Sequence, residues 1–208
     1  MATKALFNTV VNWFIRQRID QIQNFMNHPS ETQNGVLFSQ LYHAENTDYG
    51  KIYGFSSISS YDDFRRNVPI VTYEDFEPYI EKARQGKPDG FWPGYIRKFA
   101  KSSGTTNAKS KFIPISEECL EDCHFKAGKD LLSIYANNHP DNSLFSNKNL
   151  RLGGSSELYE DFNTKFGDLS AILIENLKFW AEITTTPSTK VSLMSEWESK
   201  LKAIVSVV

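Results

Sequence analysis

The chain has 208 residues, of which 40% are hydrophobic and 13% aromatic, a composition that suits one packed domain or part of a larger one. Its 23 basic and 25 acidic side chains give a formal charge of −2, so no overall positive field exists to hold a nucleic acid backbone. No apolar run approaches the roughly 18 residues that span a bilayer. We therefore expect neither a nucleic acid nor a membrane as a partner.

The N-terminal segment predicts one long amphipathic helix over about Ala5 to Asn27. Asparagines, arginines and an aspartate interrupt the apolar run that an export signal needs. With two cysteines and no export signal, the sequence favours a reducing cytoplasm. The apolar side chains recur at three- and four-residue steps, as expected of a helix packed on a core: Phe7, Val11, Phe14, Ile15, Ile22 and Phe25.

The middle of the chain predicts short helices and strands. A second helical pattern covers about residues 35–45, and two short helices flank the extended "VPIVT", with Ser60 and Thr72 as their N-caps. Residues 94–100 are expected to form a strand that leads into a loop rich in serine and threonine. "KFIPIS" predicts the next strand, and Ser116 is expected to cap the helix that follows it. The inward side chains of that helix are predicted from their spacing: Leu120, Ala127, Leu131 and Ile134.

The last third of the chain predicts a strand, a turn and two helices. "NLRLGGSS" reads as a strand that enters a Gly-Gly turn at residues 152–155, which is either a structural turn or backbone that lines a cleft. "GDLSAILIENLKFWAEI" is hydrophobic nearly all round, so it predicts one deeply buried helix. "SEWESKLKAIVSVV" predicts a further amphipathic helix.

Several polar side chains receive no functional role. Cys119, Cys123 and His124 fall on one predicted helix, but no second ligand cluster accompanies them, so we favour partly buried thiols and assign no metal. The four histidines show no spacing typical of partners, and no catalytic residue is assigned. Three acids of the helix after Thr72 are interpreted as its solvated face: Glu74, Asp75 and Glu77.

The segment "KSSGTTNAKSKFIPIS" raises the main functional question. Small hydroxylated residues around a glycine are typical of an exposed turn. They can also form a phosphate cradle, because Gly104 permits a backbone that brings successive N–H groups onto one anion. Neither the G-x-x-x-x-G-K-[ST] loop nor the G-x-G-x-x-G fingerprint occurs in the chain, so composition alone leaves both interpretations open. Hydroxyls and lysines would add donors to a cradle: Ser102, Ser103, Thr105, Thr106, Lys109 and Lys111.

A family resemblance favours the cradle. "SSGTTNAKSKFIP" resembles the phosphate-binding motif of the adenylate-forming enzymes, and most closely the version in acyl-acid amido synthetases of the plant auxin-responsive Gretchen Hagen 3 family and their bacterial relatives. Five further segments match in order and, with the loop, cover most of residues 40–205. They are "TDYGKIYGF", "DFRRNVPIVTYEDFEPYIEKARQGK", "NLRLGGS", "GDLSAILIENLKFWAEI" and "EWESKLKAI".

This resemblance implies an α/β fold, with several helices packed on an incomplete mixed sheet. It also implies an ATP- and magnesium-dependent ligase that adenylates a carboxylic acid and joins it to an amine or amino acid. Gly104 would permit the turn, and Lys111 matches the lysine that closes the family motif. Ala108 departs from a position where glycine is frequent, which indicates a slightly less open loop. The residues that would donate to the ATP phosphates are Ser102, Ser103, Thr105 and Thr106.

Members of this family are more than twice as long as this chain. We therefore expect residues 1–208 to be the N-terminal part of the large adenylation domain, without its remainder or the mobile C-terminal domain. Such a fragment is expected to be inactive alone. The alternative is a non-catalytic remnant module that binds a nucleotide or a protein partner. The sequence leaves the acid, the amine and the oligomeric state open.

Overall fold

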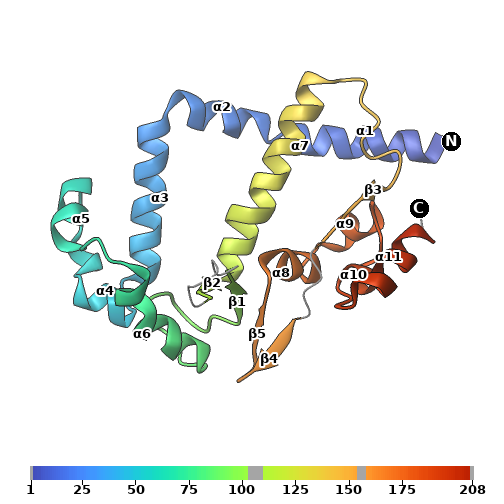
Figure 1. Ribbon diagram of the computed structural model, residues 1–208. Coiled ribbons are helices and arrows are strands. Elements are labelled where there is room, and N and C mark those ends of the chain that lie inside the picture. The colour runs from blue at the N-terminus through green and yellow to red at the C-terminus, as the bar shows by residue number, and fades with distance from the viewer. Residues whose placement is uncertain (1, 103–109, 154–157, 207–208) are drawn as a thin grey trace.

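The computed structural model describes residues 2–102, 110–153 and 158–206. Helices dominate this part of the chain, and two small sheets lie among them (Figure 1). The helices of the first half are α1 (Ala2–Arg16), α2 (Ile19–Asn27), α3 (Pro29–Ala44), α4 (Asp48–Ile52), η1 (Phe55–Ser57), α5 (Tyr61–Asn67) and α6 (Tyr73–Arg84). Those of the second half are η2 (Cys119–Phe125), α7 (Lys126–Asn138), α8 (Leu169–Glu175), α9 (Phe179–Ile183), α10 (Thr189–Ser192) and α11 (Trp197–Val205).

The larger sheet has the strand order β2-β1-β5-β4. Strand β1 pairs antiparallel with β2 and parallel with β5, while β4 and β5 form an antiparallel hairpin. A separate parallel pair joins β3 to β6. The mixed α/β fold expected from the sequence is therefore confirmed. The strands are β1 (Lys98–Lys101), β2 (Phe112–Ile115), β3 (Asn149–Leu150), β4 (Tyr159–Asp161), β5 (Thr164–Gly167) and β6 (Thr185–Thr186).

Each face of the larger sheet carries its own hydrophobic cluster. On one face, α6 packs on the sheet through Ile80 and Ala83, which join Phe99 and Phe166 in a buried cluster. On the other face, Ala100 of β1 belongs to a cluster with side chains from η2 and α8. Alternate residues of a strand point to opposite faces, so β1 contributes Phe99 to one cluster and Ala100 to the other.

The predicted N-terminal helix is broken in the structure. Helix α1 ends at Arg16 and α2 begins at Ile19, with a turn at residues 17–18. Arg18 forms an ion pair with Asp130 of α7 at 2.5 Å, a contact between distant parts of the sequence. Periodicity cannot reveal such a contact, which is why the prediction of one continuous helix is wrong.

The inward stripe predicted for the helix after Ser116 is also wrong, apart from Leu120. Leu131 and Ile134 are 69% and 43% exposed, whereas Ser133 and Ala136 are buried. Residues 119–125 form the π-helix η2, which has more residues per turn than an α-helix. This segment rotates the later residues relative to an α-helical pattern, so a different face of α7 meets the core.

The long helix predicted over residues 167–183 is two helices, α8 and α9, separated at residues 176–178. Ile172 and Ile174 of α8 are buried, but Phe179 of α9 is 78% exposed. The sequence analysis also missed the β4–β5 hairpin that precedes α8. Its turn contains Phe162 and Asn163 at positive φ, and two such residues in succession are what a tight hairpin turn requires.

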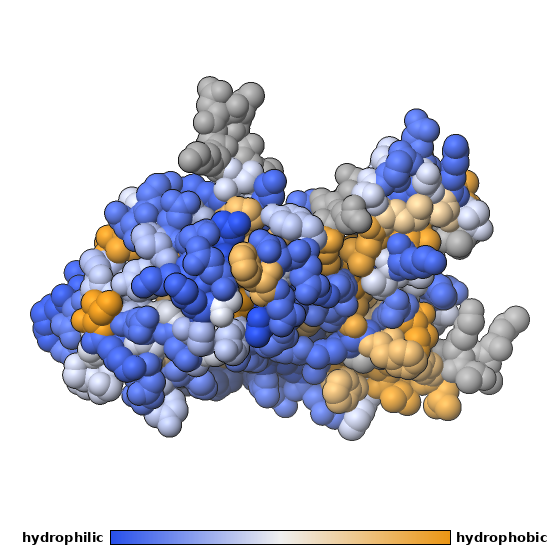
Figure 2. Space-filling view, turned by 90° about the horizontal axis from the view of Figure 1, so that it is seen from below, coloured by the Kyte–Doolittle hydropathy of each residue, from blue (hydrophilic) through white to orange (hydrophobic). Residues whose placement is uncertain are grey.

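Large hydrophobic side chains are exposed on α1, α9 and α11, and Figure 2 shows hydrophobic residues gathered toward one end of the face that it views. No helix in the described ranges is long and apolar enough to cross a bilayer. The large exposed side chains on these helices include Leu6, Val10 and Trp13 of α1, Ile183 of α9, and Trp197 and Leu201 of α11.

Candidate functional site

The serine- and threonine-rich loop connects β1 to β2 and so closes an antiparallel hairpin. At its base, the Ser102 N–H donates to the carbonyl oxygen of Lys111 at 2.8 Å, and the Lys111 N–H donates to Ser102 Oγ at 2.9 Å. These bonds join the two ends of the loop, so Ser102 and Lys111 are held side by side. Of the predicted phosphate-binding residues, Ser103, Gly104, Thr105 and Thr106 lie outside the described residues.

The side chain of Lys111 lies against the first turn of α6. Its Nζ is 2.8 Å from Glu74 Oε1 and 4.6 Å from the centre of the Tyr73 ring. The ammonium holds the pKa of the Glu74 carboxyl below its ordinary value, mainly through this hydrogen bond. The side chains of Lys111 and Glu74 are 42% and 66% exposed, so a ligand in solution can reach both.

Tyr73 also fixes the start of β2. The Phe112 N–H donates to the Tyr73 hydroxyl oxygen at 2.9 Å. Strand β2 is at the edge of the sheet, so the tyrosine satisfies a backbone donor that no neighbouring strand reaches.

Helix α6 begins where the sequence predicted. Thr72 and Asp75 form a capping box, in which each side chain accepts a hydrogen bond from the other residue's backbone N–H. The start of α5 has the N-cap bond without the reciprocal one, because Ser60 Oγ accepts from the Asp63 N–H at 3.1 Å. Both N-cap predictions are confirmed, and the capping box places the first turn of α6 beside the base of the loop.

At the second candidate, the Gly-Gly turn, a buried lysine donates a hydrogen bond to the backbone of Gly153. Lys200 of α11 is 1% exposed, and its Nζ donates to the carbonyl oxygen of Gly153 at 3.2 Å. A Cβ added at Gly153 would lie 2.6 Å from Cδ1 of Ile174, so this position has no room for a larger residue. Burial lowers the pKa of the Lys200 ammonium. Gly154 and Ser155 lie outside the described residues.

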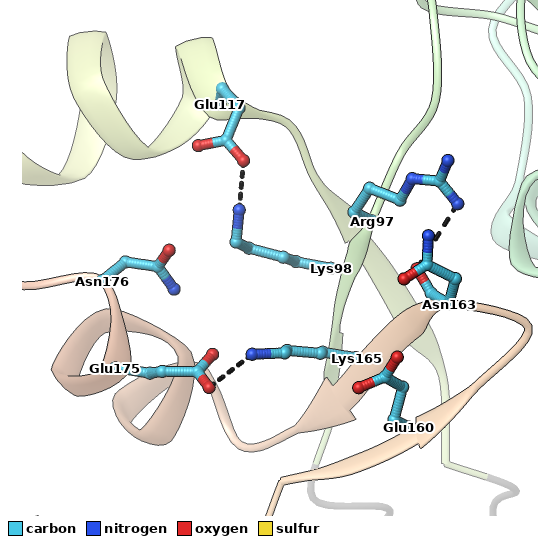
Figure 3. Close-up of a pocket in the computed structure, with 8 residues that line it drawn as sticks. All are labelled: Arg97, Lys98, Glu117, Glu160, Asn163, Lys165, Glu175 and Asn176. Carbon is cyan, nitrogen blue, oxygen red and sulfur yellow. Dashed lines mark hydrogen bonds and ion pairs between the residues drawn. The ribbon is translucent and has the colours of Figure 1, made fainter.

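A polar pocket of about 490 Å³ opens at the opposite end of β1 from the loop (Figure 3). Lys98 pairs with Glu117, and Lys165 pairs with Glu175 at 2.5 Å. Arg97 donates to the carbonyl oxygen of Asn163 at 3.4 Å. These three cations therefore already have partners within the protein, which explain their positions without a ligand.

Within the described ranges, no group of three or more His, Cys, Asp or Glu side chains could hold a metal ion. Cys119 is half-buried and Cys123 is exposed, and both are free thiols. Burial raises the pKa of the Cys119 thiol.

Two residues near the candidate sites escaped the sequence analysis. Glu74 was interpreted as part of a solvated helix face, because its partner Lys111 is 37 positions away in the sequence. Lys200 was not singled out, since lysines are rarely buried. The only hint in the sequence was its position among the apolar residues of "EWESKLKAI".

Comparison with known proteins places these features in one family. A family profile described as the GH3 family N-terminal domain matches residues 18–207. The jasmonoyl–L-amino acid synthetase JAR6 of Nicotiana attenuata is 31% identical over 104 residues, which are 50% of this chain and 18% of that protein. The indole-3-acetic acid-amido synthetase GH3.2 of Arabidopsis thaliana is 32% identical over 101 residues, or 48% of this chain and 18% of that protein.

Two solved structures have the same fold. The GH3.15 acyl acid amido synthetase superposes with a TM-score of 0.74 at 18% identity, covering 89% of this chain and 32% of that one. AtGH3.15 acyl acid amido synthetase in complex with 2,4-DB gives a TM-score of 0.67 at 19% identity, covering 94% of this chain and 33% of that one. The chain thus spans about a third of the length of its solved relatives. The profile match over nearly the whole chain, the related sequences and the common fold agree, and the chain belongs to the GH3 family.

Proposed function

We propose that the protein carrying this chain is an ATP-dependent ligase that adenylates a carboxylic acid and conjugates it to an amino acid or another amine. Family membership supports the reaction class, since related proteins are named as a jasmonoyl–L-amino acid synthetase and an indole-3-acetic acid-amido synthetase. The observation that carries the proposal is the β1–β2 hairpin, which presents Ser102 and Lys111 together at the base of the hydroxyl-rich loop.

In this proposal the carboxylate attacks the α-phosphorus of ATP, and pyrophosphate leaves. The role of the loop is to stabilise the charge that develops on the phosphate oxygens, through N–H groups, hydroxyls and the Lys111 ammonium. Gly104 permits the turn that brings these donors together. The hydroxyls assigned to the phosphates are those of Ser102, Ser103, Thr105 and Thr106.

The described residues at the base of the loop fit a phosphate ligand. The Lys111 side chain is 42% exposed, and its ammonium is a compact donor that suits phosphate oxygens. Magnesium is bound through hard oxygen ligands and usually through the phosphates of the substrate. Bound in this way, it would neutralise part of the triphosphate charge and would need few carboxylates from the protein.

We further propose that residues 1–208 form the N-terminal part of the adenylation domain, and that the reaction requires the rest of that domain and a mobile C-terminal domain. Solved relatives about three times as long as the matched region support this assignment. The chain alone is then expected to be inactive. The free thiols of Cys119 and Cys123 support a reducing compartment, the cytoplasm.

The test is ATP–pyrophosphate exchange by the full-length protein, measured with a panel of carboxylic acids. Exchange should depend on one class of acid. Replacing Thr105 and Thr106 together by alanine should lower it at least about tenfold, as is typical for the loss of a charge-stabilising donor. The exposed Ser39→Ala on α3 is the matched control and should leave the rate unchanged.

Two outcomes would contradict the proposal in different ways. If a folded full-length protein catalyses no exchange with any acid but still binds ATP, the protein is the alternative, a non-catalytic nucleotide-binding module. If exchange occurs and the Thr105→Ala/Thr106→Ala variant retains the full rate, the phosphates are not held by this loop.

A further inference from the structure

Glu74 forms an ion pair with Lys111, a cation at the described base of the loop. Its carboxylate is 2.8 Å from Lys111 Nζ, and it comes from α6 rather than from the loop or its strands. No other cation is shown in an ion pair with Glu74 in the described part of the chain. The pair thus joins one residue of the phosphate-binding motif to one residue outside it.

This ion pair contributes little to folding, because both partners are well exposed. Exposed pairs between long side chains are weak and are screened by salt. A triphosphate presents several negative charges and many acceptor oxygens, so it attracts one ammonium more strongly than a single carboxylate does. The lysine can therefore exchange Glu74 for a phosphate at small cost.

In the absence of phosphate, the Lys111 side chain has a defined position against Tyr73. The Lys111 ammonium lies 4.6 Å from the centre of the Tyr73 ring, within the range of a cation–π contact. The Tyr73 hydroxyl is fixed in turn by the Phe112 N–H at 2.9 Å. The backbone of Lys111 is anchored by Ser102, so exchange between partners needs movement of the lysine side chain alone.

We propose that Glu74 is a stand-in anion, which holds the Lys111 ammonium beside the loop until the phosphates of the substrate displace the carboxylate. Glu74 is then a positioning residue that acts through Lys111 and does not touch the substrate. It keeps the lysine extended toward α6 in the unbound protein, and it competes with the incoming phosphate. The inference rests on the proposed function, in which Lys111 binds phosphate.

Competition makes a prediction that a purely structural role does not make. Removing the carboxylate with Glu74→Gln should tighten the binding of inorganic tripolyphosphate about two- to fivefold, the range that corresponds to an exposed ion pair. Lys111→Ala should weaken the same binding about tenfold or more, since it deletes a charged donor. Both are measured by titration calorimetry on the full-length protein, with tripolyphosphate alone and with magnesium ATP.

The double variant and a matched control separate competition from general charge effects. If Glu74 acts through Lys111, Glu74→Gln has no effect on tripolyphosphate affinity once Lys111→Ala is present. Glu77→Gln removes the same charge from the same helix at an exposed position, and it should change affinity less than Glu74→Gln does.

The outcomes distinguish this inference from the proposed function. If Lys111→Ala weakens binding but Glu74→Gln leaves it unchanged or weakens it, the stand-in role is wrong and the phosphate site remains. An equal gain in Glu77→Gln, or a gain that persists in the double variant, also overturns it. If Lys111→Ala binds as tightly as the unchanged protein, or if no protein binds either probe, the phosphate site fails and the inference fails with it.

Discussion

The loop after β1 and the turn after β3 look alike in sequence, yet the structure anchors them in opposite ways. The first ends at Lys111, whose side chain is 42% exposed; the side chain of its partner Glu74 is 66% exposed. The second rests on Lys200, which is 1% exposed and donates to the Gly153 carbonyl. Both segments follow a strand and contain glycine and serine. A lysine lies at each of them: Lys111 beside the first turn of α6, and Lys200 on α11.

The difference between the two lysines indicates what each turn can do. Moving a buried charge exposes a carbonyl that has lost its donor and leaves a gap in the core, so Lys200 is a fixed part of the fold. An exposed lysine exchanges partners at small cost. We therefore propose that Gly153 and Lys200 have a structural role, and that the loop at Lys111 is the one suited to a charged ligand.

The largest expected effect tests the structural role of the Gly-Gly turn. Lys200→Ala removes a buried side chain and leaves the Gly153 carbonyl without this donor, so it should lower the free energy of unfolding by about 3 kcal/mol. Equilibrium urea unfolding measures the change. Lys202→Ala, at an exposed position of the same helix, is the control and should cost less than about 0.5 kcal/mol. Equal effects of the two variants would contradict the structural role of the buried Lys200.

A smaller effect is expected at the base of the loop. Tyr73→Phe keeps the aromatic ring beside Lys111 but removes the hydroxyl that accepts from the Phe112 N–H, so unfolding should become easier by about 1 kcal/mol. Urea unfolding again provides the measurement, and Tyr61→Phe on α5, where Tyr61 is 56% exposed, is the comparison. If Tyr61→Phe lowered the free energy of unfolding as much as Tyr73→Phe, the Tyr73 hydroxyl would not stabilise the start of β2.

The smallest effect concerns the pH dependence of the Lys111–Glu74 pair. The pKa of Glu74 is lowered in the folded protein, so the pair stabilises the fold above the ordinary glutamate pKa. That contribution is lost as the pH falls through the lowered value. The unchanged protein should therefore unfold at slightly higher urea than Glu74→Gln at neutral pH, and the gap should close in acid. A gap that stays constant down to acid pH would mean that the carboxylate does not contribute through its charge.

Local signals in the sequence predicted local structure well. Ser60 and Thr72 are N-caps in the structure because each cap depends on side chains within three residues of it. The two strands that flank the loop were also predicted, since "KFIPIS" and the residues before Ser102 combine apolar character with short length. The assignment of phosphate to Ser102, Lys111 and the residues between them stays a prediction.

Features that depend on distant contacts were not predictable. The break between α1 and α2 coincides with the contact from Arg18 to Asp130, and the exposed face of α7 follows from the π-helical turns before it. In both cases the apolar pattern was read as one regular α-helix. The apolar spacing of one segment contains no information about where contacts with another element interrupt or rotate a helix.

The sequence by itself determined the family, the mixed α/β class and the existence of a loop rich in hydroxyls between two strands. These follow from short-range spacing and from an ordered series of motifs. Only the tertiary structure decided which lysine is buried and which is exposed, and that Glu74 faces Lys111. The physical reason is that burial and charge pairing are set by packing between elements that are far apart in the chain.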